Sequence, residues 1–283
     1  MRAEFLFAFA VLLSACASEP RPADPPRLKA AYDTEAEAAK RYQRGELAQA
    51  ERRFAEAMRQ FAAIDDEAGR ERIRLHLART RLALGRATAA LELLDGAPDT
   101  DVQQVEVDML RAQAHLALRH TEQARAAVER AASRCAPACP EVAGIQLLRG
   151  RVALAAGRGG EAQVAAAAAL KLLREEVDPL ETGNAWRLSA AAQLAAGDPG
   201  AALAGAQAAL AIDRRLALPE KIARDWLLLG DIHRALARAG NAGAAEAAAA
   251  AYRHAAEVAS AAGLAEISLT ANKSFDDMGI KKN

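Results

Sequence analysis

Small residues recur along the chain at a spacing that indicates repeated pairs of helices. The pattern Gly-x4-Ala-x6-Ala occurs five times, and a sixth copy has Arg119 in place of the glycine. The first alanine of each copy lies 34 to 46 residues after that of the copy before, which is the period of a helix-turn-helix repeat. The copies are Gly45/Ala50/Ala57, Gly85/Ala90/Ala97, Arg119/Ala124/Ala131, Gly157/Ala162/Ala169, Gly197/Ala202/Ala209 and Gly243/Ala248/Ala255.

The residues around these alanines predict how the helices pack and where they end. An alanine at the first position of each copy lets two helices approach closely. A bulkier residue four positions later fills the space beside it, at Phe54, Leu94, Val128 and Tyr252. Asp198-Pro199 and Leu218-Pro219 predict helix starts, and Gly263 predicts the end of the last repeat helix.

The best copy carries a family signature. Trp226 to Gly230 reads Trp-Leu-Leu-Leu-Gly, followed by Ala248, Tyr252 and Ala255, and this resembles the tetratricopeptide repeat. The family's tyrosine position instead holds His233 here, and Arg, His, Ala or Gln in other copies. The resemblance implies an all-α fold, an α-α superhelix of about six helix-turn-helix repeats, over residues 32–263.

The N-terminus resembles that of a bacterial lipoprotein. Arg2 precedes a nine-residue apolar run from Phe5 to Leu13, about half the length needed to span a bilayer. Leu13-Ser14-Ala15-Cys16 follows and resembles a lipobox, which implies a signal peptide over residues 1–15 and a lipidated Cys16. Since no aspartate follows Cys16, the resemblance implies the periplasmic face of the outer membrane. The alternative is an ordinary secretory signal that contains a cysteine.

Two further segments flank the repeats. Residues 16–31 contain four prolines, Pro20, Pro22, Pro25 and Pro26, which favour an extended tether. Residues 264–283 carry a partial helical stripe of apolar side chains, and we expect a short helix there that caps the open end of the solenoid.

Composition narrows the class of protein. The chain has 283 residues, with 37 Lys and Arg against 37 Asp and Glu, and 52% are hydrophobic. It is too apolar for a disordered chain, and it lacks the basic excess of a nucleic-acid binder. We therefore expect a helical protein that binds no nucleic acid.

Candidate chemistry is sparse. Neither a nucleophile elbow, a phosphate-binding glycine loop nor a His-Glu-x2-His pair occurs, and the five histidines lack ligand spacing, so we expect no enzyme, metal or cofactor. Cys135 and Cys139 flank Pro137, which breaks a helix and permits a tight loop. A structural disulfide is the favoured interpretation, with an active redox or metal-binding pair as the alternative.

In the tetratricopeptide family, the first helix of each repeat lines a concave surface that binds peptides. Placing this sequence on that pattern puts apolar and arginine side chains on one helical face at i, i+4, i+7 spacing. The alternative is that this face is no peptide-binding groove, and that the leucines pack between repeats while the arginines are exposed to solvent. The candidate groove residues are Leu75, Arg79, Leu82, Met109, Gln113, Leu116, Leu147, Arg151, Leu154, Arg187, Ala191, Leu194, Leu227, Asp231 and Arg234.

The resulting hypothesis is an outer-membrane-anchored scaffold that binds a protein or peptide on the periplasmic side during assembly of an envelope complex. Arginine can grip a carboxylate through two parallel hydrogen bonds, so the expected partner is acidic or presents a C-terminal carboxylate. One alternative is a regulator that binds and activates a peptidoglycan enzyme. The other is an enzyme subunit whose site the sequence does not reveal.

Overall fold

The computed structural model describes residues 25–96, 101–135 and 139–279, and in these the regular secondary structure is helical. The expected signal peptide, Cys16 and most of the tether lie outside this range. The helices are α1 (Pro26–Gln43), α2 (Leu47–Ala63), α3 (Glu67–Ala83), α4 (Ala87–Asp95), α5 (Asp101–Ala117), α6 (Thr121–Arg134), α7 (Val142–Ala155), α8 (Gly159–Leu172), α9 (Pro179–Ala195), α10 (Pro199–Arg215), α11 (Pro219–Arg238), α12 (Ala244–Ala261) and α13 (Ala265–Asp276).

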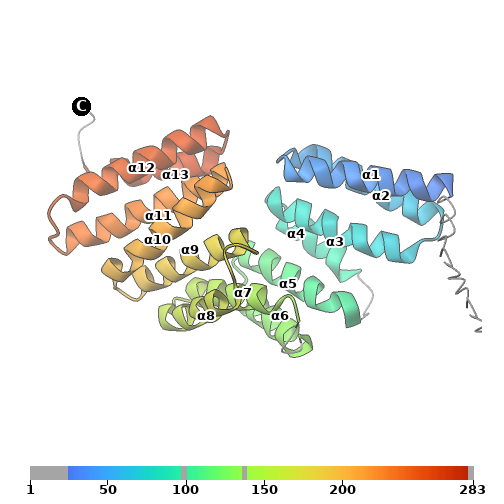
Figure 1. Ribbon diagram of the computed structural model, residues 1–283, viewed down its shortest axis with the longest axis horizontal. Helices are drawn as coiled ribbons and strands as arrows, with labels where there is room; N and C mark the ends of the chain where they lie inside the picture. Colours follow the sequence, from blue (N-terminus) through green and yellow to red (C-terminus); the bar gives the residue numbers. More distant parts are fainter. Residues whose placement is uncertain (1–24, 97–100, 136–138, 280–283) are drawn as a thin grey trace, which may run out of the picture.

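Six helix pairs, α1/α2 to α11/α12, follow one another as a solenoid. Each helix packs on the next in the chain, and Figure 1 shows the pairs side by side along a curved path. The predicted all-α solenoid of about six repeats is confirmed.

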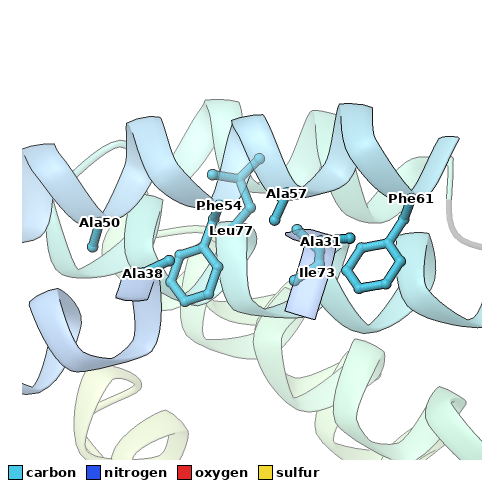
Figure 2. Close-up of a cluster of buried hydrophobic side chains, with 8 residues drawn as sticks. All are labelled: Ala31, Ala38, Ala50, Phe54, Ala57, Phe61, Ile73 and Leu77. Atoms are coloured by element: carbon cyan, nitrogen blue, oxygen red, sulfur yellow. The ribbon is translucent and has the colours of Figure 1, made fainter. Parts of the chain in front are cut away.

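The repeated alanines lie in the core, as predicted. Ala50, Ala90, Ala162 and Ala202 are fully buried. Beside them lie Phe54, Leu94, Val128 and Tyr252, each no more than 2% exposed. Figure 2 shows the first cluster, in which Phe54 lies beside Ala38, and Phe61 lies beside Ala31 and Ile73.

The glycine of the repeat has a conformational role. Gly45, Gly85, Gly157 and Gly197 follow their helices with φ between 71° and 84°. In each case the N–H of the following residue returns to a carbonyl five positions back, as Glu46 does to Arg41. This is the Schellman ending of a helix, which requires a left-handed residue. Arg119, which replaces glycine in the third copy, has the same geometry with φ 59°.

Replacing Arg119 by glycine should therefore stabilise the protein. A left-handed conformation costs a non-glycine residue about 1–2 kcal/mol. The greater freedom of unfolded glycine returns about half of that, so we expect a net gain of about 0.5–1 kcal/mol. Urea unfolding measures it. Arg125→Gly, the same change inside α6, should instead lower stability by about 1 kcal/mol. A loss in both variants would show that Arg119 is not strained.

The ends of the solenoid differ partly from expectation. Helix α1 begins at Pro26, so residues 26–31, which were expected in the tether, are helical. The reason is that the fixed φ of proline suits the first position of a helix. At the other end, α13 supplies the expected capping helix, and it packs on α12 through Phe275.

None of the described helices is both long enough and apolar enough to span a lipid bilayer.

Candidate binding surface

The odd-numbered helices form the inner layer of the solenoid. From α3 to α13 each odd-numbered helix contacts the next odd-numbered one as well as its even-numbered neighbours. Among the described residues, successive even-numbered helices make fewer contacts with one another than successive odd-numbered helices do. In a curved stack the layer with the closer spacing is the inner one. Helices α3, α5, α7, α9 and α11 therefore line the concave surface, as the family resemblance implies.

The apolar members of the expected groove pack between repeats instead of lining an open floor. Leu75 and Leu147 are 5% exposed and belong to the core, so their assignment to a peptide groove was wrong. The cause is that the first position of each expected row points toward the neighbouring repeat. Half-buried against the same or adjoining core clusters lie Leu82, Met109, Leu116, Leu154, Leu194 and Leu227.

Two of the expected groove arginines are engaged within the fold. Arg79 forms an ion pair with Glu106, which joins α3 to α5. Arg234 pairs with Asp231 at 2.9 Å and lies over the ring of Tyr252. Arg79 therefore already has a carboxylate partner within the fold.

A similar cross-repeat pair was missed at the N-terminal end. Arg72 donates from Nε and Nη2 to the two carboxylate oxygens of Glu35, both at 2.7 Å. The guanidinium also lies 5.4 Å from the ring centroid of Tyr32. This contact links α1 to α3 between residues 37 positions apart, so no spacing rule within one helix could have revealed it.

Arg187 lies at the centre of a buried cluster. Its Nε donates to Asp225 Oδ1 at 2.6 Å, and its guanidinium also pairs with Asp213. Both carboxyl groups are fully buried. Burial outweighs the attraction of Arg187 and raises the pKa of Asp225 to about 7. Arg187 therefore holds α9, α10 and α11 together and is not a free groove cation.

Arg151 differs from the other groove arginines. It is solvent-exposed and makes no salt bridge or hydrogen bond in the described part of the chain. Desolvation by the surrounding protein, and then the like charge of Arg224, lower its pKa, against the opposing attraction of Glu181. A side chain that is open to solvent and yet surrounded by protein is what the floor of a concave surface produces.

Arg151 is influenced by the charges of Arg224 on α11 and Glu181 on α9, and Asn184 donates a hydrogen bond to Glu181. On α11, Arg224 is paired with Glu220 of its own helix at 2.9 Å. Lys221 Nζ donates to Asn184 Oδ1 on α9 at 2.6 Å. Burial, and then the charge of Arg187, lower the pKa of Lys221. We call Arg151, Asn184, Lys221 and Arg224 the inner polar cluster, and its donors come from α7, α9 and α11.

Gln113 and Ala191 complete the expected rows. Both are half-buried on inner helices, Gln113 on α5 and Ala191 on α9, at the position that Arg151 occupies on α7. The inner helices on either side of α7 therefore carry no charge at this position.

Cys135 and Cys139 form a disulfide with their Cα atoms 5.5 Å apart. Cys135 directly follows α6, and Cys139 lies three positions before the first residue of α7. The bridge thus ties the end of one repeat to the start of the next.

Two of the histidines stack on aromatic rings, and the described acids and histidines form no metal site. Among the described residues, no group of three or more His, Cys, Asp or Glu side chains could hold a metal ion. His76 stacks on Phe54, and His254 stacks on Trp226 with ring centroids 4.6 Å apart. Burial, and then Arg79, lower the pKa of His76.

Comparison with known proteins agrees with this architecture. Residues 41–114 match the tetratricopeptide repeat family. The fold is similar to the crystal structure of a Rap protein complexed with competence and sporulation factor, at TM-score 0.68 and 16% identity, over 89% of this chain and 71% of that one. It is also similar to the apo form of RapI, at TM-score 0.59 and 14% identity, over 88% of this chain and 70% of that one.

A search of curated protein sequences finds no match. The family match and the structural likeness together identify a solenoid of tetratricopeptide-like repeats.

Proposed function

We propose that this protein is a lipid-anchored scaffold, on the periplasmic face of the outer membrane, that binds a protein or peptide along its inner surface. Its role is assembly of an envelope complex. The observation that carries the binding proposal is Arg151, a cation that is open to solvent on the concave floor and forms no salt bridge within the described residues. The complex of a similarly folded Rap protein with competence and sporulation factor supports ligand binding by this fold.

The chemistry of the inner polar cluster favours an acidic segment or a C-terminal carboxylate as ligand. The like charge of Arg224 contributes to the lowered pKa of Arg151, so an anion bound beside Arg151 relieves repulsion as well as forming new hydrogen bonds. Lys221 and Asn184 are hydrogen-bonded to each other, and Asn184 also donates to Glu181, so a ligand would have to share these donors. The protein thus supplies cationic and amide donors before the ligand arrives.

The anchor rests on the sequence of the N-terminus. The apolar run, the small residues and Cys16 stand in the order and spacing of a lipobox. Several acyl chains on one cysteine give stable membrane attachment, which a single chain does not. The prolines that follow place the solenoid at a distance from the lipid surface.

Replacing Cys16 by serine tests the proposal in intact cells. We expect the variant to incorporate no labelled fatty acid and to leave the membrane fraction, because a hydroxyl cannot form the thioether link. Chemical crosslinking of the wild type in the same cells should give a discrete adduct with another protein. Unchanged labelling of Cys16→Ser would reject the anchor, and an absence of any adduct would count against the scaffold.

A further inference from the structure

Two buried carboxyl groups share one cation at the junction of the fifth and sixth repeats. Asp213 on α10 and Asp225 on α11 are both fully buried. Arg187 on α9 contacts both, through Nε and Nη2 on Asp225, at 2.6 and 3.3 Å, and through Nη2 on Asp213. Two ionised carboxylates would place two negative charges against this single guanidinium.

The hydrogen bonds of the cluster are incomplete unless a proton is present. Asp213 Oδ1 is buried and has no hydrogen-bond partner. Helix α9 covers this oxygen closely, because a Cβ added to Gly183 would lie only 3.2 Å from Asp213 Oδ1. Both carboxyl groups contact the same guanidinium of Arg187, so a proton held by one of them supplies the donor that this cluster lacks.

The other charges near the pair do not replace that proton. On α11, Lys221 is within electrostatic reach of Asp213, but burial lowers its pKa and its Nζ donates to Asn184 Oδ1, and Glu220 is paired with Arg224. On α9, Glu181 accepts a hydrogen bond from Asn184. On α10, Arg214 lies over the ring of Trp226. The charged residues of α12 are all exposed, namely Glu246, Arg253, His254 and Glu257.

We propose that Asp213 and Asp225 share one proton, and that its release to solvent as the pH rises toward neutrality loosens the junction of α9, α10 and α11. With the proton in place, the pair carries one negative charge that Arg187 balances. Without it, a second buried negative charge faces the first. The C-terminal repeats then become a pH-sensitive part of the solenoid.

The direction of the pH dependence follows from linkage. Burial raises the pKa of Asp225 to about 7, above the value of about 3.9 for an unfolded aspartate. The folded state therefore holds a proton that the unfolded state has lost. Stability from this group is complete below about pH 4, declines as the pH rises, and is lost above about pH 7.

Tryptophan fluorescence can report this junction directly. The two tryptophans of the chain, Trp186 and Trp226, are adjacent in sequence to Arg187 and Asp225. We expect the equilibrium constant for urea unfolding, followed by this fluorescence, to rise about tenfold per pH unit between pH 5 and 7 and to level off above 7. Asp225→Asn, which imitates the protonated acid, should remove most of this slope and be at least as stable as the wild type at pH 8.

Asp108→Asn is the matched control. Asp108 is also fully buried, but its ion pairs are with three arginines, Arg111, Arg130 and Arg134. It does not share a single cation with another acid in these pairs. This variant should keep the wild-type slope. The proposal is overturned if Asp225→Asn keeps the same slope as the wild type, or if Asp225→Asn fails to fold at pH 8.

Discussion

Replacing Arg187 by alanine is expected to destabilise the C-terminal repeats by about 3–5 kcal/mol, because it leaves two buried carboxyl groups without their cation. Neither Asp213 nor Asp225 can reach solvent without separating α10 from α11. The variant should partly recover at low pH, since protonation of both acids removes the uncompensated charge. Urea unfolding followed by tryptophan fluorescence, at pH 5 and at pH 8, measures both effects.

Arg149→Ala provides the comparison for this variant. Arg149 makes a pair with Glu129 of similar geometry, at 2.7 Å, but both side chains are at least one-third exposed. Exposed pairs contribute about 0–1 kcal/mol, so this loss should be small. Equal effects of the two substitutions would show that burial does not determine the contribution of the Arg187 cluster.

Charge reversal at Arg151 is expected to weaken partner binding at least tenfold. A ligand carboxylate that meets glutamate in place of arginine loses its hydrogen bonds and gains repulsion, and disrupting a buried charge pair costs about 2–5 kcal/mol. Stability should change little, because Arg151 has no ion pair to lose and a glutamate there would face Arg224. Partner capture compared with thermal melting measures the two effects separately.

The architecture could be read from the sequence because it is determined by contacts that repeat. The position of Ala50 recurs as a fully buried alanine in all six copies, and a bulkier residue such as Phe54 follows it in four of them. The positive φ at Gly45 is likewise repeated, and it explains the recurring glycine. The beginning of α1 was misplaced because Pro26 is compatible both with an extended tether and with the first turn of a helix.

The inner surface was harder to predict, because its properties depend on contacts between different repeats. The i, i+4, i+7 spacing placed Leu75, Arg79 and Arg187 on inner helices but could not identify their partners. The partner of Arg79 is 27 residues away, and that of Arg187 is 38 residues away. Asp213 and Asp225 were missed for the same reason. Among the expected groove arginines, Arg151 is the one without a salt bridge to another described residue, so it remains available to a ligand.

The most direct test of the inner-surface proposal places a photo-crosslinking residue at Gln113, on inner helix α5, or at Val164, which is 73% exposed on outer helix α8. In intact cells the proposal predicts a protein adduct from Gln113 and none from Val164. Arg151→Glu should strongly reduce that adduct, whereas Arg52→Glu, an exposed reversal on outer helix α2, should not. Full capture by a normally folded Arg151→Glu variant, or an adduct from Val164 alone, would contradict binding along the inner surface.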